Sequence, residues 1–128
     1  MFRNILALLA ATVWISASEF FRNQFLFKSL WVAHYQKLGV AFPAEPINGA
    51  ILGIWSLAMA LLIFILIPRY KLWQTTLIAW LASFVMMWLV IGNLGVLPHA
   101  LLWYAVPLSL LECFVAALIL TGLPKKRA

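Results

Sequence analysis

The sequence contains few charged residues: 9% of its 128 residues are charged, and no aspartate is present. A soluble globular domain has about 25% charged residues. Here 66% of the residues are hydrophobic and the mean hydropathy is +1.06. These values exclude an ordinary soluble domain and indicate an integral membrane protein. Without aspartate, the acidic clusters that bind metal in prenyl-transfer enzymes are also excluded.

Cysteine and histidine are equally scarce. The single cysteine, Cys113, lies in an apolar run, so an intramolecular disulfide, a CxxC pair and a cysteine-based zinc site are excluded. His34 and His99 lie near segment ends without a nearby carboxylate, which makes a weak metal signal. No serine and histidine share a span, and no glycine-rich loop follows a strand. We therefore expect no metal and no cofactor, and neither proteolysis nor nucleotide hydrolysis.

Long hydrophobic runs are what the sequence has in abundance. Uncharged or nearly uncharged runs of about 20 residues each span about 30 Å as helices, which matches the hydrocarbon core of a bilayer. They predict an all-α integral membrane bundle of four transmembrane helices in a single domain over residues 1–128. The expected helices are about 4–21, 47–67, 72–91 and 100–123, with an amphipathic segment at about 22–38.

The first apolar run, Ile5 to Ser18, is short and has two interpretations. It resembles a secretory signal peptide, with small residues at the cleavage positions 16–18. Alternatively it is an uncleaved helix that continues through a phenylalanine-rich stretch, and we expect this form. The helical period of residues 22–38 fits either a helix lying on the membrane or a continuation of the first helix. In both, Arg22 and Asn23 fall on the polar side.

Lysine and arginine predict the orientation. The net charge is +6, and the basic residues lie at segment ends, which favours contact with anionic lipid over nucleic acid. The termini and the second loop hold Arg3, Arg69, Lys71, Lys125, Lys126 and Arg127, whereas the first connection holds Arg22, Lys28 and Lys37. By the positive-inside rule, both termini are cytoplasmic, in a membrane of the bacterial inner-membrane type.

Small residues recur along the second helix. Gly49, Gly53, Ser56 and Ala60 follow one another at spacings of four, three and four, which places them on one stripe. Small stripes allow helix backbones to approach closely within a membrane. We expect this stripe to pack within the chain; an interface with another membrane subunit or with a second copy is the alternative.

Glu112 lies in the middle of the fourth helix, with Ser109 one turn away on the same face. An ionised carboxylate at this depth is costly, by about 2.5–3.5 kcal/mol on insertion scales. Glu112 therefore either binds protons or a cation, or fastens helices together. Its potential partners are Glu19, Arg22 and Asn23, which share a helix face. We expect a Glu19–Arg22 pair that reaches the outer interface; a buried cluster of Glu112, Ser109, Arg22 and Asn23 is the alternative.

The first third of the chain also suggests a relationship. The run Ala10 to Ser16, the run Phe25 to Trp31 and Gly39 form a pattern that resembles the first helix of an uncharacterised bacterial family. That family is a domain of unknown function found in small four-helix membrane proteins. The resemblance implies the four-helix architecture and carries no known site.

Three functional hypotheses follow. The first is a non-enzymatic membrane subunit or accessory protein that binds partner helices. The second is a small proton-coupled transporter or channel in which Glu112 exchanges protons. The third is a lipid-modifying enzyme, which requires Glu19, His34 and His99 to converge.

Overall fold

The structure, a computed structural model, describes residues 1–122, and this part of the chain is helical without a strand. The predicted basic residues Lys125, Lys126 and Arg127, and the last residue of the predicted fourth helix, lie outside the described residues. The elements are α1 Phe2–Phe21, η1 Arg22–Leu26, α2 Lys28–Lys37, α3 Pro46–Leu66, α4 Leu72–Trp80, η2 Leu81–Val85, α5 Met86–Asn93, η3 His99–Leu101 and α6 Leu102–Gly122.

Four helical segments are long and apolar enough to cross a membrane, as predicted. Three of them consist of several elements: η1 continues α1, the π-helical turn η2 joins α4 to α5 into one rod, and η3 leads into α6. The expected boundaries differ from the observed ones by a few residues at most, except at the end of the first span. The spans are Phe2–Leu26, Pro46–Leu66, Leu72–Asn93 and His99–Gly122.

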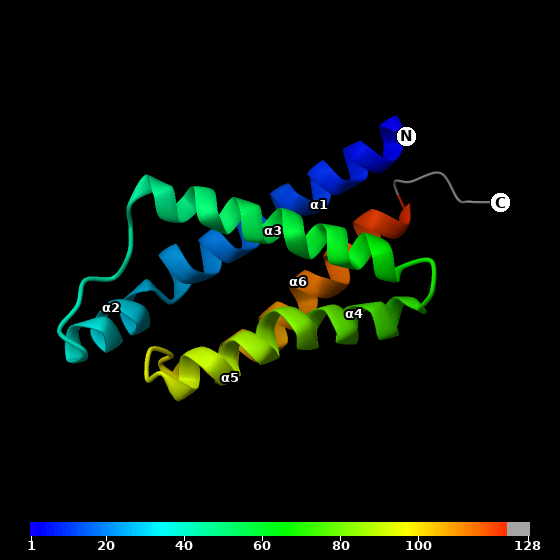
Figure 1. The fold of residues 1–128 in the computed structure, drawn as a ribbon. Coiled ribbons are helices and arrows are strands. Elements are labelled where there is room, and N and C mark those ends of the chain that lie inside the picture. The colour runs from blue at the N-terminus through cyan, green and yellow to red at the C-terminus, as the bar shows by residue number, and fades with distance from the viewer. Residues whose placement is uncertain (123–128) are drawn as a thin grey trace.

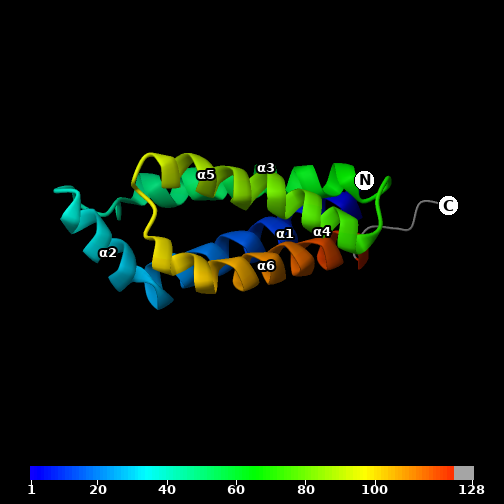
Figure 2. The same ribbon diagram turned by 90° about the horizontal axis from the view of Figure 1, so that it is seen from below.

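The four spans form a bundle in which α3 and α6 contact each other and each also packs against α1 and α4. α1 lies between α3 and α6, and α4 lies between the same two helices. Figures 1 and 2 show the resulting two layers, α3 with α4 and α5 over α1 with α6. The start of α1, the α3–α4 turn and the last turn of α6 lie at one end, here called the N-terminal end (Figure 1). α2 and the loop after α5 lie at the other, here called the α2 end.

Local sequence signals set the starts of α3 and α4. The Asn48 side chain accepts a hydrogen bond of 2.9 Å from the backbone N–H of Glu45, and Pro46 occupies the first helical position. The Gln74 side chain accepts one of 3.0 Å from the N–H of Lys71 in the same way. Such side-chain caps satisfy backbone groups that a helix end leaves unpaired. Both starts are therefore defined by residues three positions apart.

The core at the N-terminal end consists mainly of small side chains. Alanines recur one turn apart on α1 and pack against alanines and branched residues of α3 and α6, which lets the backbones approach closely. The fully buried members include Ala7, Ala11, Ile15, Ala60, Ile63, Ala116 and Ala117. A second, smaller cluster of Leu97, Leu101 and Ala105 lies near the α2 end.

The small-residue stripe of α3 is used only in part. Ser56 and Ala60 are buried within the bundle, whereas Gly49 is exposed and Gly53 is half-buried. A Cβ atom added at Gly49 or Gly53 would meet no other atom within 4 Å. Packing within the chain, as expected, therefore accounts for the second half of the stripe, and the first half faces open space.

The predicted amphipathic segment 22–38 needs a correction. Residues 22–26 form a π-helical turn that extends the first span, and the helix breaks only at Phe27, with φ −118° and ψ 15°. Lys28–Lys37 then forms α2, which has no buried residue. The prediction placed Arg22 on the polar face of this segment, but its side chain enters the bundle. The physical reason is that its charge is paired there with carboxylates.

Candidate functional site

Three polar residues of the first span are bound to one another inside the bundle. Arg22 Nη2 donates to Glu19 Oε1, and Asn23 Nδ2 donates to Glu19 Oε2 over 2.9 Å. Their spacings of three and four residues place these side chains on one helix face. Glu19 and Arg22 are each only 5% exposed. Both carboxylate oxygens of Glu19 are therefore satisfied within its own helix.

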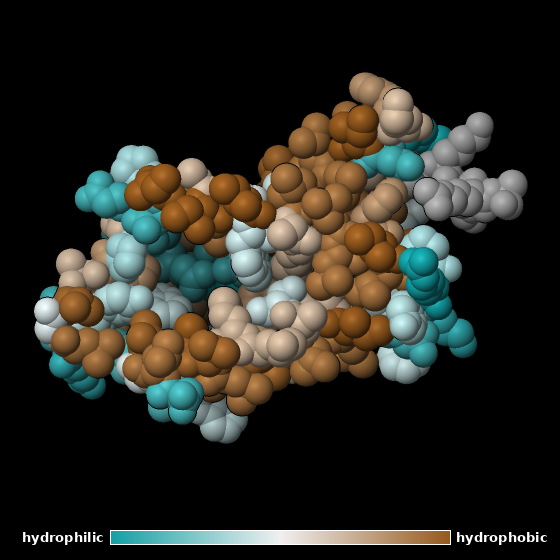
Figure 3. All heavy atoms as spheres, viewed as in Figure 1, coloured by the Kyte–Doolittle hydropathy of each residue, from teal (hydrophilic) through white to brown (hydrophobic). Residues whose placement is uncertain are grey.

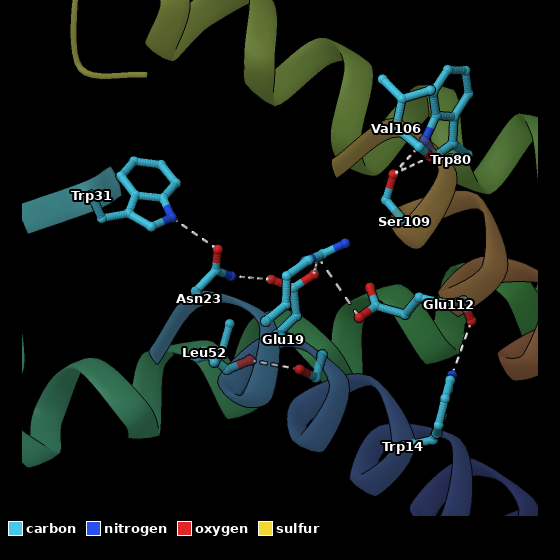
Figure 4. A network of polar contacts seen from close by, with 11 residues as sticks. Trp14, Glu19, Asn23, Trp31, Leu52, Trp80, Val106, Ser109 and Glu112 are labelled. Carbon is cyan, nitrogen blue, oxygen red and sulfur yellow. Dashed lines mark hydrogen bonds and ion pairs between the residues drawn. The ribbon is translucent and has the colours of Figure 1, made fainter. Parts of the chain in front are cut away.

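Glu112 of α6 faces this group from across the bundle. It is fully buried, and Arg22 Nη2 lies 3.8 Å from its Oε1. Neither carboxylate oxygen of Glu112 accepts a hydrogen bond from any described residue, and Arg22 Nη1 likewise donates none. Figure 4 shows the carboxyl group of Glu112 directed towards Glu19, with a dashed line for its ion pair with Arg22. The arrangement links the first span to α6 by electrostatic attraction. Arg22 Nη1 and both carboxylate oxygens of Glu112 remain without hydrogen bonds to described residues.

The charges of this cluster do not balance. Two carboxylates, Glu19 and Glu112, share one guanidinium, so the fully ionised cluster has one excess negative charge. Buried charges are stable only when they are compensated and hydrogen-bonded. The cluster therefore has a place for one further positive charge, which a proton or a cation bound at Glu112 supplies.

Two π-helical turns meet at Arg22. One is η1, which begins at Arg22, and the other is η2, which contains Phe84. The guanidinium carbon lies 5.3 Å from the centre of the Phe84 ring, a distance at which a cation is attracted to the ring face. Such turns shift the side chains that follow them and are frequent at functional sites. No sequence signal announced either turn, and sequence analysis missed Phe84.

Tryptophans fix both ends of the cluster. Trp31 Nε1 of α2 donates to Asn23 Oδ1 over 3.0 Å, and Trp14 Nε1 donates to the backbone oxygen of Glu112 over 3.0 Å. The contacts form a continuous series from Trp31 through Asn23, Glu19 and Arg22 to Glu112 (Figure 4). Sequence analysis missed both tryptophans because their partners lie eight and 98 residues away.

Ser109 does not join the cluster. Its hydroxyl accepts a hydrogen bond of 2.8 Å from Trp80 Nε1 and donates one of 3.0 Å to the backbone oxygen of Val106. The expected Glu19–Arg22 pair is present, but both side chains are buried in the bundle and do not extend outwards as expected. The structure instead contains the buried alternative with Glu19 in the place of Ser109. Burial follows from Glu112, which attracts the arginine into the bundle.

A groove of about 320 Å³ lies between α1 and α6 and reaches this cluster. Arg22 and Glu112 belong to its lining, and most of the remaining wall is apolar. The opposite face of the molecule, formed by α3 with α4 and α5, is hollowed as well: Figure 3 shows hydrophilic atoms at the bottom of a depression in a mostly hydrophobic surface.

The histidines lie apart from the cluster. His34 Nε2 is 2.7 Å from the backbone oxygen of Gly95, a contact that links α2 to the loop after α5 at the exposed end of the bundle. His99 begins the short helix η3. Within residues 1–122, no three His, Cys, Asp or Glu side chains gather in a way that holds a metal ion. The convergence of Glu19 and His34 that a lipid-modifying enzyme requires has no support in these contacts.

Comparisons with known proteins add no further constraint: no family model, no curated protein and no solved structure matches the chain. The resemblance of the first third to a bacterial four-helix family stays a prediction.

Proposed function

We propose that this small multi-span membrane protein is a non-enzymatic, proton-coupled carrier or channel in which Glu112 takes up and releases a proton. One observation carries the proposal. Glu112 is fully buried in the middle of a span, is only loosely paired with Arg22, and has no hydrogen-bond donor on either oxygen among the described residues. Ionisable residues inside a span mark ion and proton pathways by default.

Arg22 supplies the coupling. It lies between two carboxylates, bonded to Glu19 and 3.8 Å from Glu112. An ionised Glu112 attracts the guanidinium, and a protonated Glu112 releases it to Glu19. The other groups that act electrostatically near this point are Glu19 on α1 and Cys113 on α6. A proton on Glu112 thus changes the balance of contacts between α1 and α6, which is the element that two conformations require.

The orientation belongs to the same proposal. Arg3, Arg69 and Lys71 lie at the N-terminal end of the bundle, and Lys28 and Lys37 lie towards the α2 end. Arg22, which the sequence count placed outside, belongs to the bundle interior and no longer weighs against the assignment. The positive-inside rule then predicts that the N-terminal end lies on the cytoplasmic side of a bacterial inner membrane.

Proton flux into proteoliposomes tests the proposal. Purified protein is reconstituted around a trapped pH-sensitive dye, and a potassium diffusion potential drives protons inward. We expect flux from the wild type and none from Glu112→Gln, which keeps the side-chain shape and removes the exchangeable proton. Thr76→Val is the matched control, because Thr76 is buried in α4 and donates only to its own helix, at the oxygen of Leu72. Equal flux from wild type and Glu112→Gln overturns the proposal.

A second function is favoured by the open half of the α3 stripe. Gly49 and Gly53 leave space beside α3 that no described residue fills, and small residues are what close helix contacts in membranes use. A membrane subunit or accessory protein, bound to another protein or to a second copy through this surface, is the function it supports. Native mass spectrometry of the protein extracted in mild detergent, with Gly53→Leu as the variant, tests it; loss of an assembly in the variant is the expected result.

A further inference from the structure

The groove between α1 and α6 combines two chemistries in one space. Its walls include the apolar side chains of Trp14, Phe21, Leu108 and Leu111, and Glu112 lies in its lining. Phe21 and Leu111 are each 53% exposed on the outside of the spans. In a membrane, this side of the bundle contacts lipid chains, so the groove opens towards the hydrocarbon region. A ligand that enters it comes from the bilayer.

The polar part of the groove favours a ligand with a positive charge. Both Glu112 oxygens are buried acceptors without a donor among the described residues. Of the two other polar residues in the lining, Arg22 is already bonded to Glu19 and Ser18 has no charge. The ionised cluster has one excess negative charge. A donor with a single positive charge satisfies both the acceptors and the charge, whereas an anion adds to the excess.

The volume limits the size of the ligand. Binding cavities for drug-sized molecules occupy roughly 300–1,000 Å³, and this groove, at about 320 Å³, is at the lower limit. One aromatic ring on a short chain suits it, with the ring against Trp14 and Phe21. The indole of Trp14 is held in place by its hydrogen bond to the backbone of Glu112, so the wall and the carboxylate belong to one fixed unit.

We propose that this groove is a binding site for a small lipophilic ammonium, with the apolar body between α1 and α6 and the ammonium group donating to Glu112. The inference rests on the proposed function and names its substrate class, because the ammonium and the proton use the same carboxylate. Binding of one displaces the other. The charged or titratable groups around that carboxylate are Glu19 and Arg22 of the first span and Cys113 of α6.

Equilibrium dialysis against protein in lipid nanodiscs tests the site, with empty nanodiscs subtracted. The probe is radiolabelled 2-phenylethylammonium. Its matched neutral and anionic analogues are 2-phenylethanol and 3-phenylpropionate. We expect saturable binding of the ammonium and no saturable binding of the alcohol or the carboxylate. The affinity for the ammonium is expected to fall at lower pH, because protons compete for Glu112. Equal binding of the alcohol means that the groove only absorbs apolar rings, and overturns the proposal.

Two variants locate the binding. Glu112→Gln is expected to weaken it by about tenfold or more, because a hydrogen bond to a charged group contributes at least that factor. Ala17→Phe fills the groove from its exposed wall without changing a charge, and is expected to weaken binding to a similar extent. The control is Ala58→Phe, because Ala58 is an exposed alanine on α3 that lies outside the groove. Undiminished binding in Ala17→Phe overturns the site even if Glu112→Gln fails to fold.

Proton flux measured on the same preparations separates the two proposals. Wild-type flux without ammonium binding refutes the site and leaves the proton pathway in place. Saturable ammonium binding without proton flux, whether the ammonium is absent or present, supports the site and refutes the proposed carrier or channel. Retained flux with lost binding in Ala17→Phe is the result expected if both are correct.

Discussion

The two halves of the bundle bury polar side chains in different ways. At the N-terminal end, the hydroxyls of the half-buried Thr12 and the buried Thr76 donate to the backbone of their own helices, at Leu8 and Leu72. Thr75, whose hydroxyl has no partner among residues 1–122, is an exception. Towards the α2 end, Trp31, Asn23, Arg22 and Glu112 bond or pair across elements.

This difference distinguishes a fixed half of the bundle from a half that can respond to its surroundings. The half at the N-terminal end, with the alanine-rich core, is here called the anchor. Hydroxyls that bond to their own helix impose no geometry on the neighbouring helix, so the packing of small and branched apolar side chains sets the spacing there. Side chains that bond across helices make the spacing depend on charge and protonation. The N-terminal half is therefore expected to stay fixed while the half with Glu112 responds to a proton or a ligand.

Removing Arg22 is expected to have the largest effect. Arg22→Met leaves Glu19 and Glu112 buried near each other without a cation, and breaking a buried pair in this way costs about 3–5 kcal/mol. The measurement is the free energy of unfolding in mixed micelles titrated with SDS. Lys28→Met, at an exposed position, is the control. Restoration of stability in the triple variant with Glu19→Gln and Glu112→Gln identifies uncompensated charge as the cause, and failure to restore it contradicts the account.

Overpacking the anchor is expected to come next. Ala60 is fully buried on α3, and a leucine there forces α3 away from the neighbouring helices. Insertions of this size in a packed core cost about 1–3 kcal/mol. The same SDS titration measures the loss. An unchanged unfolding free energy in Ala60→Leu would show that the alanine core is not closely packed.

Loss of one bond at the edge of the cluster is expected to have a smaller effect. Trp31→Phe keeps an aromatic ring and removes the donor to Asn23 Oδ1. A hydrogen bond of this kind contributes about 1 kcal/mol. Amide hydrogen exchange of residues 22–26 measures the change locally, and we expect faster exchange there with unchanged exchange in α4. Uniform acceleration in all spans would contradict a local role.

The open part of α3 is expected to tolerate bulk. A side chain at Gly53 meets no atom of this chain within 4 Å, so Gly53→Leu changes the unfolding free energy of the monomer by about 0.5 kcal/mol or less. The contrast with Ala60→Leu, seven residues further along the same stripe, is the measured quantity. Equal losses from both substitutions would remove the distinction between the two halves.

Hydropathy was sufficient to predict the four spans, because runs of about 20 apolar residues have few alternatives. The position of Glu112 in the middle of an apolar run was enough to select it as a candidate site residue. The spacings of three and four residues were enough to predict that Glu19, Arg22 and Asn23 share a helix face. The burial of Arg22 was considered only as an alternative, since it depends on the π-helical turn that extends the first span to Leu26. Phe84 and Trp14 come from contacts between distant segments, which no local pattern encodes.

An infrared titration of the protein in lipid membranes tests the central claim most directly. The carboxyl band of the wild type is followed over pH, and subtraction of the Glu112→Gln spectrum assigns the part that belongs to Glu112. The account predicts a Glu112 band that disappears and returns reversibly as pH is raised and lowered, which shows an exchangeable proton inside the bundle. A Glu112 signal that does not respond to pH would mean a locked carboxyl group and would contradict the account.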